Sequence, residues 1–176
     1  MSGAEGGVTA GGAGDGPGED ATARLRRELR EAFEARAHFY RLTLDALEAR
    51  LGAAEAEAAL AAICEQRGRE VAPAFAGARG AVAVGEAFLA ASPDRGRLYP
   101  ATVRREEGRI AFAVAACPLK SAWLAAGLGP ARVAALCRAA GAFDKGLFEG
   151  CGLRFRNETW EEGREGCCRI VLEDGA

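Results

Sequence analysis

VRREEGRIAFAVAACP, residues 103–118, is where the chain changes from a helical to an extended pattern. Large apolar residues from Ile110 to Val114 alternate with alanines, which is the two-residue period of a β-strand. The turn letters EEG separate this run from residues 103–105, and Pro118 cannot donate a hydrogen bond to a strand ladder. The pattern therefore predicts a hairpin whose second strand ends at Cys117.

Cys117 combines two features of a reactive thiol. By strand parity it shares a face with the small alanines, which leaves room for a ligand above that side of the sheet. A helix is predicted to begin at Pro118, and a cysteine at a helix N-terminus loses its proton more easily. Cys117 is therefore the candidate nucleophile, and Trp123, two turns or less away, is a candidate pocket residue. The only histidine, His38, leaves a Cys-His dyad open.

Outside this hairpin, apolar residues recur every three or four positions, which predicts helices. A long amphipathic helix starts at Asp20, a favourable N-cap, and ends at Gly52, and a second runs from near Ala53 until Pro73 stops it. The remaining predicted elements are a weak helix around 84–91, a short helix at 118–127, a helix from 130 to about 147, and a second hairpin built from GLRFRNET (152–159) and CCRIVLE (167–173). The expected fold class is α+β, with N-terminal helices packed with a four-stranded antiparallel sheet that carries two inserted helices.

Length and composition restrict the class of protein. The chain has 176 residues, of which residues 1–19 form a Gly-rich segment that we expect to be a disordered tail, and 20–176 suffice for a single α+β domain. A net charge of -2 gives no reason to expect nucleic acid or an anionic membrane as partner, and charged residues interrupt every alanine-rich run. We expect a cytoplasmic protein that binds a small molecule, and the long first helix leaves a homodimer open.

Six cysteines in a reducing compartment are expected to be free thiols, ligands or core residues. Cys64 and Cys151 are assigned to the core, because a lone buried cysteine usually behaves as a small hydrophobe. C-x-x-C and H-x-x-x-H spacings are absent from the sequence, and its glycines do not form a phosphate-binding motif. The sequence therefore predicts no metal site and no cofactor.

Cys137 and Asp144 lie on one face of the helix that starts at Pro130, two turns apart. A carboxylate on an otherwise apolar stripe is informative, because burying it is costly unless it is paired or used in chemistry. Asp144 is therefore the second candidate catalytic residue, and Cys137 is a candidate substrate-binding residue.

For the adjacent cysteines of the last strand, the sequence must decide which side chain faces the core. Strand parity places Cys168 on the apolar face with Ile170 and Leu172, and places Cys167 on the opposite face. A bulge after the preceding turn would shift this facing by one residue.

Three stretches, AACPLKSAWLAAGL, LCRAAGAFDKGLFEGCGLRF and TWEEGREGCCRIVLE, resemble the L-2-amino-thiazoline-4-carboxylic acid hydrolase family. The resemblance covers about residues 22–173 and includes a Thr-x-x-x-Gly-x-x-x-Cys stretch that begins at Thr159. The family positions that match are Cys117, Cys137, Asp144, Thr159 and Cys167. Family members often have His before the last cysteine and an acidic residue after it, whereas this chain has Gly166 and Cys168.

The resemblance implies a hydrolase that opens a C–N or C=N bond in a small cyclic amidine or thiazoline carboxylic acid. It implies Cys117, Asp144 and Cys167 as catalytic residues. Cys137, Trp123, Thr159 and Cys168 are the predicted substrate-binding residues, and Arg138 or Arg169 is a candidate for binding the substrate carboxylate. Two alternatives stay open: a non-catalytic sensor or binding domain whose cysteines hold a ligand or a metal, and a helical dimerisation module.

Overall fold

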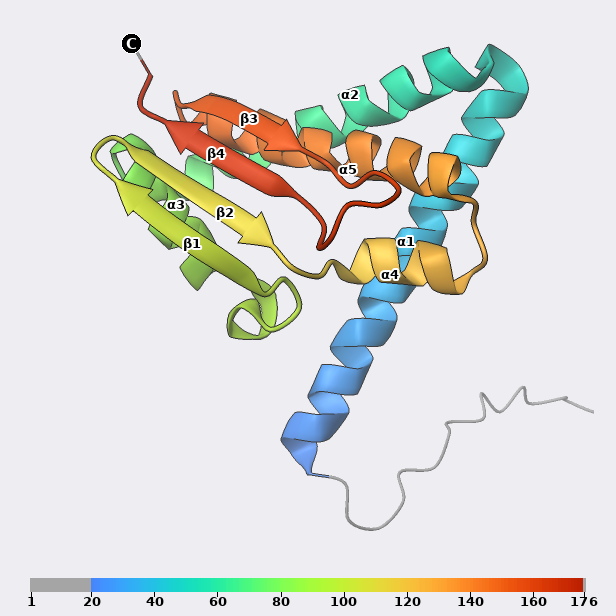
Figure 1. Ribbon diagram of the computed structural model, residues 1–176, viewed down its shortest axis with the longest axis horizontal. Coiled ribbons are helices and arrows are strands. Elements are labelled where there is room, and N and C mark those ends of the chain that lie inside the picture. The colour runs from blue at the N-terminus through green and yellow to red at the C-terminus, as the bar shows by residue number, and fades with distance from the viewer. Residues whose placement is uncertain (1–19, 176) are drawn as a thin grey trace, which may run out of the picture.

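The computed structural model of the protein describes residues 20–175, so the expected disordered tail at 1–19 lies outside the described residues. Within residues 20–175 it has five α-helices and four strands, as the α+β prediction required (Figure 1). The helices are α1 Ala21–Leu51, α2 Ala53–Val71, α3 Gly80–Ala90, α4 Pro118–Ala125 and α5 Pro130–Gly150. The strands are β1 Ala101–Glu106, β2 Arg109–Val114, β3 Arg154–Glu158 and β4 Arg169–Glu173.

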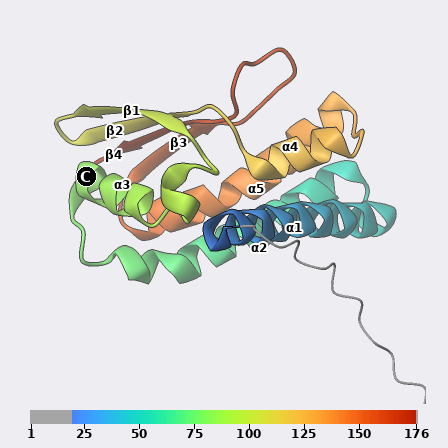
Figure 2. The same cartoon turned by 90° about the horizontal axis from the view of Figure 1, so that it is seen from below.

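The four strands form one antiparallel sheet in the order β1-β2-β4-β3. Helices α4 and α5 are inserted between β2 and β3, which confirms the predicted pair of insertions. Figure 2 shows the sheet as one layer with the helices on one side of it. The inner face carries buried residues such as Ile110 and Phe112, whereas Ala113 on the other face is exposed. The alternation of buried and exposed residues along β2 therefore arises because helices cover only one face of the sheet.

A side-chain cap fixes the start of α1, and glycines allow α2 and α5 to pack closely. The Asp20 carboxylate accepts a hydrogen bond from the Thr22 amide at 3.3 Å, which caps the start of α1. Helices α2 and α5 approach so closely that a Cβ on Gly146 would collide with the Glu65 carbonyl group, and one on Gly68 would collide with that of Phe143. This close contact fixes α5, and with it the residues that α5 presents to the sheet.

The buried residues form two clusters that we call the helical cluster and the sheet cluster. The helical cluster consists of Ala37, Leu44, Ala56, Leu60, Cys64, Leu119, Trp123, Val133, Ala134, Leu136, Cys137, Ala139, Trp160 and Cys167. The sheet cluster consists of Ala81, Val84, Ile110, Phe112, Leu147, Phe148, Leu153, Ile170 and Leu172. Val114, Phe143 and Cys168 pack against both. The two clusters therefore meet at the end of β2 and the start of β4.

The predicted end of the second strand is wrong. Strand β2 stops at Val114, and Cys117 is instead the N-cap of α4. The Ala115 amide still donates a 2.7 Å hydrogen bond to the Pro100 carbonyl oxygen next to β1, and beyond Ala115 the chain leaves the sheet and leads into α4. Strand parity no longer applies beyond that point, so Cys117 packs against the helical cluster and does not share the exposed alanine face.

No helix in residues 20–175 is both long enough and apolar enough to cross a membrane.

Candidate active site

Cys117 lies partly buried where β2 leads into α4. A hydrogen bond from the Cys167 thiol lowers the pKa of Cys117 to about 7, against the opposing effect of burial. The backbone N–H groups of Lys120 and Leu119, in the first turn of α4, lower this pKa further. The lowered pKa favours the thiolate form of Cys117 near neutral pH.

A β-bulge before β4 turns Cys167 toward the Cys117 thiolate. The Cys167 amide donates to the Val114 carbonyl oxygen at 2.8 Å, and the Val114 amide donates to the Cys168 carbonyl oxygen at 2.9 Å. Two residues thus oppose one, which is the arrangement of a β-bulge. Strand parity was wrong for Cys167, which is 3% exposed, because the bulge adds one residue before the regular ladder begins.

Both thiols of the bulge lie on the core side of the sheet. Their Sγ atoms are 3.3 Å apart, and Cys168 is partly buried between the two clusters. Hydrogen bonds to Cys117 and to Cys168, together with burial, raise the pKa of Cys167. Cys167 therefore keeps its proton and donates it to the Cys117 sulfur, which is the arrangement that stabilises one thiolate beside a neutral thiol.

Asp144 and Cys137 reach the same region from α5. Burial raises the pKa of Asp144 to about 7, and the Arg36 guanidinium lowers it by a smaller amount. The Asp144 charge in turn raises the pKa of Cys117, so the two groups interact. Burial, with the charges of Cys117 and Cys168, raises the pKa of Cys137 to about 12, so that Cys137 is a neutral thiol.

Three groups near this site were missed by sequence reasoning: Arg36, Tyr40 and Tyr99. The Arg36 Nη2 atom donates to the Tyr40 hydroxyl oxygen at 3.2 Å, and the Arg36 side chain lies over the Tyr40 ring. Tyr99 precedes β1; burial raises its pKa, and the charges of Cys117 and Asp144 also act on it. The spacing of Arg36 and Tyr40, one helical turn apart on the first helix, was the only signal in the sequence.

Three other candidate residues, Trp123, Thr159 and His38, differ in how far they are exposed to solvent. Trp123 is 1% exposed and its Nε1 atom donates to the Ala37 carbonyl oxygen at 2.8 Å, so it joins α4 to α1 inside the helical cluster. Thr159 is partly buried beside α5, where its methyl carbon lies 3.0 Å from the position that a Cβ would take at Gly141. His38 is exposed on α1 and is not among the groups that shift the pKa of Cys117.

The two arginines considered for the substrate carboxylate lie elsewhere. Arg138 is exposed and forms a bidentate ion pair with Glu57, with N–O distances of 2.6 and 2.8 Å. Arg169 is exposed at the start of β4. Two other cationic side chains act on this site: Arg36, which is exposed, acts on Asp144, and Lys120, which donates to the Gly166 carbonyl oxygen, acts on Cys137.

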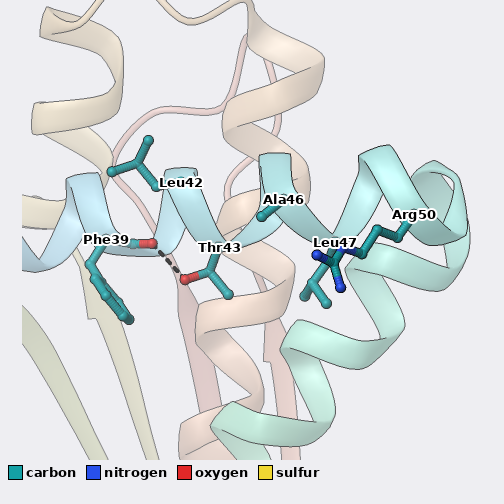
Figure 3. Close-up of a pocket in the computed structure, with 6 residues that line it drawn as sticks. All are labelled: Phe39, Leu42, Thr43, Ala46, Leu47 and Arg50. Carbon is teal, nitrogen blue, oxygen red and sulfur yellow. Dashed lines mark hydrogen bonds between the residues drawn. The ribbon is translucent and has the colours of Figure 1, made fainter.

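An apolar hollow on α1 is separate from these groups. It is lined by Phe39, Leu42, Thr43, Ala46, Leu47 and Arg50, all from one helix (Figure 3). Its one hydroxyl, that of Thr43, donates to the Phe39 carbonyl oxygen at 2.8 Å. The lining of the hollow therefore has no thiol, carboxyl or imidazole group, and its hydroxyl is engaged with the helix backbone.

The described residues 20–175 contain no group of three or more His, Cys, Asp or Glu side chains placed to hold a metal ion. The thiol and charged groups that act on one another at the site are Cys117, Cys137, Asp144, Cys167, Cys168, Arg36 and Lys120.

Comparison with known proteins gives one clear result. No curated protein and no solved structure matches the chain significantly. The model of one family, L-2-amino-thiazoline-4-carboxylic acid hydrolase, matches residues 30–171, a range that contains Cys117, Asp144 and Cys167. This confirms the resemblance seen in the three sequence stretches, and the chain belongs to the L-2-amino-thiazoline-4-carboxylic acid hydrolase family.

Proposed function

We propose that the protein is a hydrolase that opens the ring C–N bond of a small cyclic amidine, such as a 2-amino-thiazoline carboxylic acid. The observation that supports this most strongly is that a thiol at a helix N-terminus interacts with a partly buried acid from another helix. Both Cys117 and Asp144 have a pKa of about 7, so a nucleophile and a proton donor coexist at neutral pH.

In the first step, the Cys117 thiolate attacks the amidine carbon while protonated Asp144 gives its proton to the ring nitrogen. The Asp144 carboxylate then moves a proton from the exocyclic nitrogen to the ring nitrogen. The ring C–N bond breaks, the ring nitrogen leaves as an amine, and the carbon stays bound to the Cys117 sulfur.

In the second step, water adds to that carbon and a water proton passes to the remaining nitrogen. Asp144 recovers its proton from the new hydroxyl group as the carbonyl forms, and Cys117 leaves as a thiolate. The hydrogen bond from Cys167 favours this departure, because it stabilises the thiolate. One water is consumed, one C–N bond is broken, and both catalytic groups return to their starting forms.

The remaining groups would bind the substrate. Arg36 is exposed and close enough to act on Asp144, so it is placed to attract a substrate carboxylate at the edge of the site. The neutral thiols Cys137 and Cys168, with Thr159, would line the ring. Trp123 would support α4 from behind, because its indole is already buried and hydrogen-bonded.

The test is turnover of 2-amino-thiazoline-4-carboxylate, followed by mass spectrometry of the ring-opened product. We expect Cys117→Ala to lower the turnover rate at least about 1000-fold, as the loss of a nucleophile does in other enzymes. Its melting temperature should stay close to that of the wild type, because Cys117 is only partly buried.

Cys151→Ala is the matched control, since the Cys151 thiol donates to the Ala72 carbonyl oxygen at 3.8 Å and packs against the sheet cluster. It should keep full turnover. Full turnover by Cys117→Ala would refute the proposal. Binding of the compound by the wild type without turnover would favour the non-catalytic binding domain.

A further inference from the structure

The Asn157 side chain is the one orphaned polar group in the interior of the described residues. Asn157 lies on β3, opposite the buried Ile170 of β4, so that its side chain is on the helix-covered face of the sheet. Both its Oδ1 and its Nδ2 atom are buried, and neither has a hydrogen-bond partner within residues 20–175.

An unpaired buried amide needs an explanation. A buried donor or acceptor without a partner destabilises the fold, and most such groups in proteins are paired. A carboxamide offers an acceptor oxygen beside two N–H donors. A single ligand that presents a donor and an acceptor side by side would satisfy both atoms.

The position of the amide connects it with the site. The Nδ2 atom lies 2.9 Å from the place that a Cβ would take at Gly141, so only a glycine lets the amide lie against α5. Gly141 is one turn from Cys137 and three residues before Asp144, and these three positions share one face of α5. The amide thus faces the stripe of α5 that carries the proposed acid.

We propose that Asn157 binds the amidine edge of the substrate and thereby selects a ring with an exocyclic amino group. This inference rests on the proposed function. A neutral cyclic amidine has an exocyclic N–H donor beside a ring-nitrogen acceptor. The Asn157 Oδ1 atom accepts from the exocyclic nitrogen and the Nδ2 atom donates to the ring nitrogen, the same pairing that asparagine makes with the donor and acceptor of adenine.

This pairing predicts specificity as well as affinity. A thiazoline carboxylate without the exocyclic amino group keeps the ring nitrogen but leaves Oδ1 without a donor. A site built to hydrogen-bond a group discriminates against the analogue that lacks it. Asn157 is therefore a substrate-binding residue that distinguishes cyclic amidines from simple cyclic imines.

The test measures binding by calorimetry in a Cys117→Ala background, which separates binding from turnover. The two ligands are 2-amino-thiazoline-4-carboxylate and thiazoline-4-carboxylate. We expect the parent to bind the amino compound roughly 10- to 100-fold more tightly, as one or two hydrogen bonds allow. Asn157→Leu should lose this preference while its melting temperature is unchanged or higher, because an apolar residue replaces an unpaired amide.

Arg156→Leu is the matched control, because Arg156 is the adjacent residue of β3 and its exposed side chain pairs with Glu173 at 2.7 Å. It should keep the preference. A preference retained by Asn157→Leu, or a lower melting temperature with equal loss of both ligands, would overturn the inference while wild-type turnover still upholds the proposed function. Failure of the parent to bind either ligand, with no wild-type turnover, would overturn both.

Discussion

The two hydrophobic clusters of this protein differ in what they bury. The sheet cluster is built from hydrocarbon, with Phe148 in edge-to-face contact with Phe88, at 5.0 Å between ring centroids, and stacked on Phe155 at 5.9 Å. The helical cluster includes the thiols of Cys64, Cys137 and Cys167, and Cys117 packs at its edge. Hydrocarbon burial stabilises a fold, whereas buried ionisable groups weaken it unless they are paired. We infer that the sheet cluster provides stability and that the helical cluster carries the chemistry.

The largest effect expected from this comparison is on stability. Phe148→Ala should lower the free energy of unfolding by about 3–5 kcal/mol, because it leaves a cavity among aromatic rings. Chemical denaturation measures this loss. Phe39→Ala, at a side chain that is 72% exposed, is the control and should change stability by less than about 0.5 kcal/mol. Equal losses in the two variants would contradict the role of the sheet cluster.

The next effect comes from Asp144, whose pKa of about 7 lies above its value of about 4 in an unfolded chain. Between these pH values the folded protein binds more protons than the unfolded chain. The free energy of unfolding should therefore fall as pH rises from about 4 to about 7, and this contribution should be constant above that range.

Asp144→Asn removes this contribution, since the amide does not titrate. The variant should gain stability relative to the wild type as pH rises to about 7, as measured by denaturation at a series of pH values. The difference between the two proteins therefore reports the titration of Asp144 together with its interaction with Cys117. If the difference in free energy of unfolding does not change with pH, the pKa of the Asp144 carboxyl group is not raised in the folded protein.

The smallest effect on stability is expected at the surface, where Arg138 pairs with Glu57. Arg138→Gln should cost about 0.2–1 kcal/mol, because solvent screens an exposed ion pair. It should leave the KM for 2-amino-thiazoline-4-carboxylate unchanged. Arg36→Gln is the matched variant and should raise KM about tenfold, through loss of an ionic hydrogen bond to the substrate carboxylate. A higher KM in Arg138→Gln alone would favour Arg138, one of the two arginines predicted from the sequence, over Arg36 as the residue that binds the carboxylate.

Much of the site was visible in the sequence. The placement of Cys137 and Asp144 on one helix face follows from the helical period, and Pro118 marked the helix that begins after Cys117. For the direction of Cys167, the spacing from Thr159 agreed with its buried position and strand parity did not, because a bulge adds one residue before the regular ladder.

The groups that sequence reasoning missed reach the site from distant segments. Arg36 lies on α1, Tyr99 precedes β1 and Asn157 lies on β3, and no local pattern relates their positions. The hydrogen bond of Trp123 was hidden for the same reason, since its partner, Ala37, is 86 residues away.

The sequence alone determined the helices, the hairpins and the family, because caps, turns and apolar periods act on neighbouring residues and on backbone angles. The tertiary structure alone decided that Cys117 receives a hydrogen bond from Cys167, that Asp144 is partly buried with a raised pKa and that Asn157 is unpaired. Those properties depend on which helices and strands pack together and so remove these side chains from water. That is settled only when α5 packs against α2 and the sheet, where glycines permit the close approach.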